Sequence, residues 1–475
     1  MDNDPRIRAQ AEKLPDMNTL EGIINLIFSF KAFVMFPIFM IILGTILRMK
    51  FSIILLSALK LGVGFSGIFL LFDNFVINIA PALEMIISIR GLNYPILDVG
   101  WPPLAGITWA SSIAPLTIPM IICANLIMIA TNLTRTIYID IWNFWHFALL
   151  GALLQNTNHS FFLSMLATLL IGIYCIKLSE WTSPYVHKEC GLVGITVSPV
   201  SVVGLLPYAV AANILLDKIP WINKLHFNAN KTTTRLEIFG EPMIIGVLVG
   251  LFLGLMAEYE LKALSELCIN IAAVLFLLPH CGTIIGKGME PFAINLKARI
   301  TNIFPNKKDL VIAIESAVLF QNKSVIVTGV ILMPIAIIIA LVLPGNQIIP
   351  LGDLPNLISV MAVIVIVCES NVFRGIILGI PIIIAYLLIA TEFAPLFTNL
   401  SRQYGLDYTN EYSGNISAFT DGGNPIRYWF YYIFNGNFIA ILVIPIVIIL
   451  FFITWKKHKL LISSENQNIL NTDAP

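Results

Sequence analysis

The sequence is poor in charge, and neither sign of charge is in excess. Only 12% of its 475 residues are Asp, Glu, Lys or Arg, and 28 basic residues balance 28 acidic ones. A protein that binds nucleic acid through its phosphates usually carries a basic excess. The composition therefore gives no reason to expect nucleic acid as a partner.

Cysteines are few, scattered, and never paired as CxxC. They are typical of small buried hydrophobic residues, and they are Cys123, Cys175, Cys190, Cys268, Cys281 and Cys368. A metal site would need His or carboxylate ligands at short spacing, and a nucleophile would need a neighbouring base. Neither pattern is visible, so the sequence predicts no metal, no cofactor and no self-contained catalytic site.

A short basic leader of the cleavable type is also missing, because residues 1–22 are polar and mixed in charge. Apolar sequence is what the chain has in abundance. Hydrophobic residues make up 57% of it, and its mean hydropathy is +0.86. A water-soluble domain of this size has no core large enough to bury so much apolar surface. We therefore expect a multi-pass membrane protein.

Long apolar runs predict an all-α fold with about eleven crossings, since about 20 apolar residues span a bilayer as a helix. The expected crossings are residues 24–47, 53–73, 113–132, 160–178, 193–216, 240–257, 263–283, 325–343, 372–391, a broken one at 412–434, and 438–455. Two further apolar stretches, 141–155 and 354–368, are too short to span easily. We expect them to be arms of re-entrant hairpins, which are tolerated where they line a cavity inside the protein.

The pattern of residues 37–216 recurs in the same order in the second half of the chain. Asp140 and Asp353 each introduce one of the short apolar stretches, and Asn158 and Asn371 follow at the same offset (353 − 140 = 213 and 371 − 158 = 213). An internal repeat in an apolar chain is typical of a transporter, with the substrate site between the two copies.

Five crossings per copy would turn the second copy upside down relative to the first, with the last crossing left over. The positive-inside bias favours an outer N-terminus and a cytoplasmic C-terminus. The basic residues then left outside, apart from the N-terminal segment, are Arg90, Lys177, Lys188, Lys262 and Arg402. The expected parts are a polar N-terminal segment, a first membrane repeat, a cytoplasmic linker, a second membrane repeat with its hairpin, an extra helix and a cytoplasmic tail, at residues 1–23, 24–216, 217–239, 240–434, 435–457 and 458–475.

Polar residues at membrane depth need a reason, because a charge there costs at least about 2.5 kcal/mol. Carboxylates and amides pair with hydroxyl groups, and aromatic faces cover C–H surface, so these residue types together favour a polyhydroxylated ligand. The candidate substrate-binding residues are Asp98, Trp101, Trp109, Asn143, His146, Glu241, Glu315, Asn346, Asp353, Glu369 and Asp421.

Several candidates also have a purely structural interpretation. The tryptophans could belong to the aromatic belt at the membrane interface, and Asp353 could cap the helix that follows it. His146 could be a hydrogen-bonded packing residue, and Glu241 could start a helix. Glu315 and Glu369 have no such interpretation at the depth that hydropathy predicts. Glu315 is the favoured single candidate.

Five short motifs occur in order along the chain: Asp98-Val99-Gly100-Trp101-Pro102, Asp140-Ile141-Trp142-Asn143, Phe239-Gly240-Glu241-Pro242, Gly352-Asp353-Leu354 and Asp421-Gly422-Gly423. Together they resemble the galactitol-type enzyme IIC, the membrane permease of the bacterial phosphoenolpyruvate-dependent sugar phosphotransferase system, over about residues 24–457. The resemblance implies a homodimer in the cytoplasmic membrane, surrounded by lipid, that translocates a polyol or related sugar. It also implies that a separate cytosolic IIB subunit, phosphorylated on cysteine and served by IIA, phosphorylates the substrate.

The chain departs from the family pattern at three places. Where the family has Pro-His-Gly-Thr-Ser, Leu-Asp-Pro-Ala and His-Arg-Gly-Asn, this chain has Ser198-Pro199-Val200-Ser201-Val202, Ile314-Glu315-Ser316-Ala317 and Cys368-Glu369-Ser370-Asn371. Histidines are lost from positions expected to line the cavity, and an unmatched buried polar group costs about 1–3 kcal/mol. The substrate therefore stays open among hexitols, pentitols and related sugars. An ion-coupled secondary transporter of a small polar solute is the alternative function.

Overall fold

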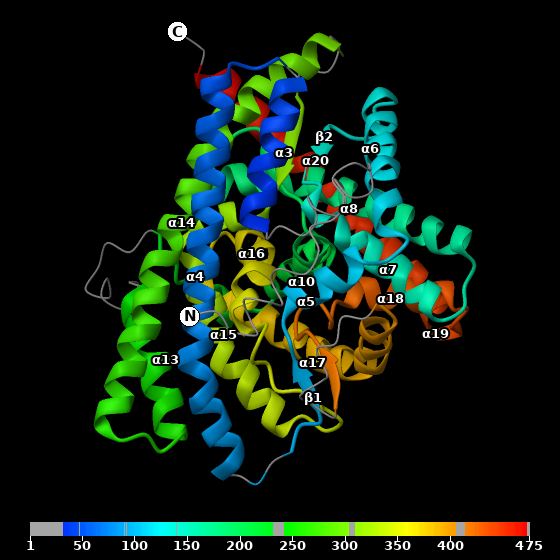
Figure 1. Ribbon diagram of the computed structural model, residues 1–475. Helices are drawn as coiled ribbons and strands as arrows, with labels where there is room; N and C mark the ends of the chain where they lie inside the picture. The colour runs from blue at the N-terminus through cyan, green and yellow to red at the C-terminus, as the bar shows by residue number, and fades with distance from the viewer. Residues whose placement is uncertain are drawn as a thin grey trace, which may run out of the picture.

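The computed structural model describes residues 32–46, 48–89, 91, 93–138, 140–230, 242–303, 309–404 and 414–472. The fold is mostly helical, as the apolar runs predict (Figure 1). The first half contains α3 (Ala32–Ile46), α4 (Phe51–Ile89), β1 (Ile96–Asp98), α5 (Trp101–Trp109), α6 (Ala114–Ala130), β2 (Thr136–Tyr138), the 3-10 helix η1 (Trp142–Phe144), α7 (Trp145–Asn156), α8 (Phe161–Cys190), β3 (Ile195–Val197), α9 (Val200–Val203), α10 (Leu206–Leu216) and α11 (Pro220–Asn223).

The second half contains α13 (Pro242–Met256), α14 (Leu261–Ile303), β4 (Val311–Ile314), the 3-10 helix η2 (Ser316–Gln321), α15 (Lys323–Val342), the 3-10 helix η3 (Leu354–Asn356), α16 (Leu357–Val367), α17 (Val372–Gln403), β5 (Asn415–Ser417), α18 (Pro425–Phe434), α19 (Phe438–Leu442) and α20 (Ile444–Thr472). The predicted N-terminal segment, residues 1–23, and the second part of the predicted linker lie outside the described residues.

Six of the described helices are long and apolar enough to cross a membrane. A seventh span results if α5 and α6, which are bent by 87° against each other, are counted together. The predicted count of eleven is therefore not confirmed. Residues 193–216 were expected to be one crossing but form β3, α9 and α10. Pro199 and Pro207 explain the breaks, because proline cannot continue the hydrogen bonding of a preceding helix.

Four helices form an outer group, in which α3 packs on α4, α4 on α14, and α14 on α13. Figure 1 shows α4 and α14 side by side along much of their length. Both are longer than the expected crossings, at 39 and 43 residues. Close packing depends on small residues, because a Cβ added at Gly67 would lie 2.7 Å from the Cys281 Sγ atom.

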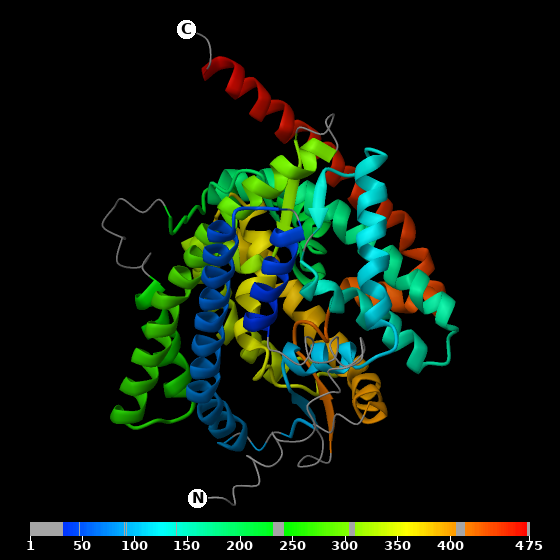
Figure 2. The same ribbon diagram turned by 45° about the horizontal axis from the view of Figure 1, so that its top comes forward.

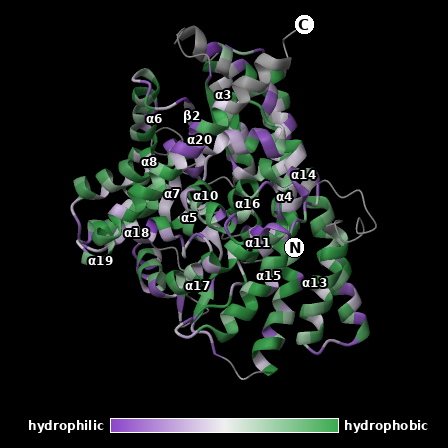
Figure 3. Ribbon diagram, turned by 180° about the vertical axis from the view of Figure 1, so that it is seen from behind, coloured by the Kyte–Doolittle hydropathy of each residue, from purple (hydrophilic) through white to green (hydrophobic). Residues whose placement is uncertain are grey.

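The remaining helices form an inner group, from which α20 extends at the C-terminal end (Figure 2). Hydrophobic residues run along most of α13, α15 and α17 (Figure 3). At the centre of the inner group lie α7 and α16, which are only 12 and 11 residues long. Every residue of α16 is buried. The apolar stretches 141–155 and 354–368, which are too short to span a membrane easily, thus form short helices enclosed by the rest of the protein.

Short parallel strands join the two halves of the chain, and the sequence pattern did not predict them. In the first half β1 pairs with β5 of the second half, with Asp98 opposite Ser417. In the second half β4 lies between β2 and β3 of the first half. Each strand is three or four residues long. The pairing brings the ends of β1 and β4, and the residues that follow them, to the neighbourhood of α7 and α16.

Two of the predicted outer loops lie beside residues that were predicted to be cytoplasmic. Lys188, at the end of α8, lines the same cavity as Asp217 and Lys457. The path through β3, α9 and α10 therefore returns the chain to the end of the molecule where α8 finished. Lys177 and Arg135, predicted to be on opposite faces, both contact the Glu180 carboxylate, at 2.7 and 3.5 Å. The helix that was expected to cross at 160–178 continues to Cys190.

Candidate functional site

A central cavity lies between α4 of the outer group and the N-terminal ends of α7 and α16. Its free volume is about 70 Å³. Polar side chains from both halves of the chain line it, and they are Asn143, His146, Ser201, Glu315, Asn356, Ser359 and Asp421. Aromatic side chains also line it, and they are Phe65, Phe69, Trp101, Trp142, Trp145 and Phe320.

Asn143 is placed by η1, the turn that precedes α7. Its side-chain amide donates to the Asp140 Oδ2 atom at 2.7 Å and to the Glu315 carboxylate. Asp140 also accepts from the hydroxyl of Ser198, which follows β3. Glu315 follows β4, so these contacts connect the first half of the chain to the second. The contacts position the Asn143 amide and the Glu315 carboxylate at the cavity wall.

Glu315 begins η2 and is half-buried. Its Oε1 atom accepts from the backbone N–H of Ser316 at 2.8 Å and from the Ser316 hydroxyl at 2.7 Å. The Ser316 hydroxyl lies 2.6 Å from the Ser359 hydroxyl. The carboxylate thus has local donors, and it still reaches the cavity surface, where it can accept from a ligand hydroxyl.

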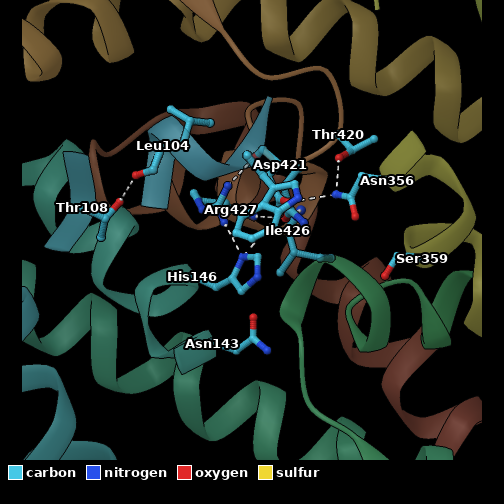
Figure 4. Close-up of polar contacts among 12 residues, drawn as sticks. Leu104, Thr108, Asn143, His146, Asn356, Ser359, Thr420, Asp421, Ile426 and Arg427 are labelled. Atoms are coloured by element: carbon cyan, nitrogen blue, oxygen red, sulfur yellow. Dashed lines mark hydrogen bonds and ion pairs between the residues drawn. The ribbon is translucent and has the colours of Figure 1, made fainter. Parts of the chain in front are cut away.

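The opposite wall comes from η3 and from the turn before α18. Asn356 donates to the Thr420 hydroxyl at 2.8 Å and to the Asp421 Oδ2 atom at 3.2 Å. Figure 4 shows Asn356 and Ser359 facing the space that His146 and Asn143 approach from the other side. Amide and hydroxyl groups there can both donate and accept, which suits a ligand with many hydroxyl groups.

A buried arginine closes the cavity beneath His146. Arg427 is 1% exposed, and it donates to the backbone carbonyl of Asp421. The His146 Nδ1 atom lies 3.3 Å from an Arg427 nitrogen and 3.3 Å from the Asp421 Oδ1 atom. The imidazole stacks on the Trp145 ring at 3.9 Å between centroids, and Trp101 stacks on Trp145 at 6.3 Å. The charge of Arg427 is therefore compensated by Asp421, and three flat rings cover the cavity.

Five of the eleven predicted residues come together at this cavity. They are Trp101, Asn143, His146, Glu315 and Asp421. Glu241 lies outside the described residues. Trp109 is half-buried and packs on the back of the cavity-lining Trp142, with ring centroids 6.1 Å apart.

Asp98 and Asp353 lie behind the wall and brace it. Asp98 accepts from the backbone N–H of Phe419 at 3.1 Å and from that of Asp353 at 3.0 Å. Asp353 accepts from the backbone N–H of Trp101 at 3.3 Å and of Thr420 at 2.9 Å. The side chain of Asp353 makes no capping bond to the helix that follows it. Both carboxylates connect distant segments, and Asp353 bonds the first residue of α5 instead of the helix that follows it in sequence.

Asn346 and Glu369 were also predicted for the site and lie elsewhere. Asn346 donates to the carbonyls of Ala340 and Ile348, at 2.9 and 2.8 Å, and so holds the turn after α15. The side chain of Glu369 is 67% exposed and pairs with Lys188 at 2.7 Å. Glu369 lies in the turn between α16 and α17, at the end of α16 that is away from the central cavity.

Sequence reasoning missed four polar residues of the site. Asn356 had a usable signal, because it follows Asn143 by the 213 residues that also separate Asp140 from Asp353. Arg427 is the single charged residue of α18, which also marks it. Ser201 and Ser359 carry no comparable signal. Among the described residues, no group of three or more His, Cys, Asp or Glu side chains is arranged to hold a metal ion.

Comparison with known proteins gives a consistent result. Residues 26–410 match the family model of the sugar-specific permease component of the phosphotransferase system. The chain is 32% identical, over 91% of its length and 95% of the relative, to the galactitol-specific EIIC component of Escherichia coli K12, and equally to that of E. coli O157:H7. It is 31% identical to a putative permease IIC component of E. coli K12, over 81% of this chain and 88% of the relative. With its apolar helices, the chain belongs to the family of sugar-specific permease components of the phosphotransferase system, which are multi-pass proteins of the cytoplasmic membrane that work with IIA and IIB subunits.

Proposed function

We propose that this chain binds a polyol or a related sugar in the central cavity and translocates it for phosphorylation by a cysteine-phosphorylated IIB subunit. The observation that carries the proposal is the lining of the cavity, where carboxylates, amides and hydroxyls face stacked indole rings. Hydroxyl groups of a polyol can pair with the polar side chains, while its C–H surface lies against the rings. The names of the galactitol-specific relatives agree with this ligand class.

The substrate would lie between two repeats of opposite orientation, residues 24–216 and 240–434. Two features support the repeat. The first half has a long helix, a strand, a short helix and a further helix in the order α4, β1, α5 and α6. The second half repeats this order as α14, β4, η2 and α15. The strand pairing is also reciprocal, because β1 pairs across to β5 and β4 pairs across to β3. A two-fold relationship between the halves would produce such an exchange.

The central cavity, at about 70 Å³, is well below the roughly 300–1,000 Å³ of typical small-molecule pockets. Binding would therefore require the lining to separate. Phe65 and Phe69 belong to α4 of the outer group, whereas the polar lining belongs to the inner group. We infer that movement of the outer group relative to the inner group opens the cavity.

The orientation we propose has the C-terminus in the cytoplasm and the N-terminus outside. Lys188 lies beside Lys457, and Lys177 lies beside Arg135. Both lysines would then be on the cytoplasmic side, which leaves fewer basic residues on the outer face than the sequence predicted. This strengthens the positive-inside argument. A homodimer surrounded by lipid is part of the proposal and follows from the family resemblance.

Transport by membrane vesicles tests the proposal. Vesicles supplied with phosphoenolpyruvate, the general phosphotransfer proteins and the cognate IIB subunit should accumulate phosphorylated substrate. Vesicles that lack IIB should not. Accumulation of unmodified substrate driven by a proton or sodium gradient would reject the proposal and favour the ion-coupled secondary transporter. A panel of hexitols and pentitols in the same assay identifies the substrate.

A further inference from the structure

A second cavity lies at the far end of α16 from the central one. Its volume is about 240 Å³. The ends of α8, α10, α16 and α17 and the middle of α20 surround it. Its charged lining consists of Lys188, Asp217, Glu369, Arg374 and Lys457. Three cations and two carboxylates therefore face a space larger than the central cavity, and the proposed transport function does not use them.

Arg374 is held rigidly at the wall of this cavity. Its guanidinium donates to the side-chain oxygens of Asn213 and Asp217 at 2.7 Å each and of Asn223 at 2.6 Å. The residue lies in the first turn of α17, where unpaired backbone N–H groups already carry positive partial charge. A cation is unfavourable at that end of a helix. An anion bound in the cavity would relieve the concentration of positive charge.

Asp217 pairs with Arg374 at 2.7 Å, and Glu369 supplies the second negative charge of the cavity. The Glu369 Oε1 atom lies 2.7 Å from the Lys188 Nζ atom. The hydrogen bond from Lys188 lowers the pKa of Glu369, and the charges of Lys188, Lys457 and Arg374 lower it further. The carboxylate therefore sits where the fields of three cations meet. Since its side chain is 67% exposed, water can replace it at little cost.

The turn that carries Glu369 is strained. Glu369 and Ser370 are consecutive non-glycine residues with φ of 56° and 59°, the left-handed conformation that residues with a Cβ atom rarely adopt. The turn is kept in place because the Ser370 hydroxyl donates to Glu189 at 2.5 Å and accepts from Asn322 at 2.9 Å. Backbone strain of this kind is concentrated at ligand sites and switches.

We propose that the second cavity is a binding site for a phosphoryl group, with Lys188, Arg374 and Lys457 as its ligands and Glu369 as the carboxylate that the phosphoryl group displaces. This inference rests on the proposed function, because phosphotransfer supplies a dianion at the face of the membrane that carries Lys457. Lysine and arginine are the side chains that bind phosphate most strongly.

The site is separate from the place of sugar binding. Ser359, in the first turn of α16, lines the central cavity, and Ile366, in its last turn, lines the second one. Seven residues of α-helix rise about 10 Å. A phosphoryl group in the second cavity therefore does not touch a polyol in the central cavity. The second cavity receives the phosphorylated species before or after the transfer.

Inorganic phosphate is the first probe, titrated by ³¹P NMR into the purified chain in phosphatidylcholine nanodiscs. Saturable binding is expected. Lys188→Gln should weaken it about fivefold or more, because one charge-assisted bond is lost, and Lys188→Arg should retain it. Glu369→Gln should tighten binding, because the competing carboxylate is gone. Lys456→Gln, which removes the same charge from the neighbouring residue of α20 that does not line the cavity, should have no effect.

Lys188→Gln and Glu369→Gln are expected to change phosphate affinity in opposite directions, which distinguishes a binding site from a structural ion pair. Absence of saturable binding, or weakening by Glu369→Gln as well as by Lys188→Gln, would overturn the inference. Polyol binding measured by tryptophan fluorescence in the same samples separates the two proposals. If the protein binds polyol and couples transport to phosphorylation but does not bind phosphate, only the phosphoryl site in the second cavity is rejected. If transport by the parent protein is not coupled to phosphorylation, the proposed function is rejected.

Two sources of the phosphoryl group are distinguished by further titrations. Tighter binding of the phosphorylated polyol than of inorganic phosphate, reversed by Lys188→Gln, identifies the product as the ligand. Preference for phosphorylated over unphosphorylated IIB, again lost in Lys188→Gln, identifies the partner subunit. If neither species responds to Lys188→Gln, the site does not bind a phosphoryl group.

Discussion

The side-chain amide of Asn143 donates to the carboxylate of Glu315 across the boundary between the two halves of the chain. Asn143 belongs to η1, and Glu315 follows β4, which pairs with β2 and β3. One hydrogen bond thus depends on a strand pairing between residues about 170 positions apart. If the substrate lies at this wall, both groups should affect its binding.

Glu315→Gln keeps the size of the side chain and one acceptor but removes the charge. We expect polyol binding to weaken by about 1–3 kcal/mol, because hydrogen bonds from ligand hydroxyls to a carboxylate are stronger than those to an amide. Calorimetry on purified protein measures the change. Glu392→Gln is the matched control, since Glu392 pairs with Tyr428 and Tyr432 away from the cavity. Unchanged affinity, or an effect on folding alone, would remove Glu315 from the site.

Asn356→Ala deletes the amide on the opposite wall. Affinity for the polyol should fall by roughly fivefold to tenfold, which corresponds to about one hydrogen bond. Asn346→Ala removes the same group from a turn that does not line the cavity, so it should lower the melting temperature and leave affinity unchanged. Equal effects of the two substitutions on affinity would mean that Asn356 acts through folding.

The packing of α13 on α14 depends on a series of glycines spaced four residues apart. A Cβ added at Gly250 would lie 2.6 Å from the Cys268 Cα atom, and one at Gly246 would lie 2.6 Å from the Ala272 Cα atom. Gly250→Val should force the helices apart and cost about 1–3 kcal/mol of stability. Gly286→Val on α14 is the control, because no atom lies within 4 Å of its added Cβ. Equal melting temperatures for the two variants would contradict this account.

Labelling from outside intact cells tests the proposed orientation. In a background without other cysteines, a cysteine at Asn93 should react with an impermeant thiol reagent, and one at Asn230 should react only after the cells are opened. Both positions are exposed in the structure, so protection would reflect the membrane and not burial. Reaction at Asn230 in intact cells would reverse the orientation.

Two chemically similar residues, Asp98 and Glu315, show what the sequence could not predict. Asp98 ends strand β1 and Glu315 follows strand β4, and both were predicted to reach the substrate. Glu315 lines the cavity, whereas Asp98 accepts backbone N–H groups behind it. The two carboxylates are chemically alike, so only the contacts made by their neighbours separate them.

The sequence by itself determined that this chain is a membrane protein of helices, because 57% hydrophobic residues in long runs cannot be buried in water. It also determined the family, because its motifs occur in order along the chain. The tertiary structure alone decided which polar residues share one cavity. The strands β1 to β5 are too short to leave a periodic pattern, yet their pairing between the halves brings Asn143, Glu315, Asn356 and Asp421 together. Long-range pairing of this kind depends on which backbone groups remain without partners after the helices have packed, and no local stretch of sequence records it.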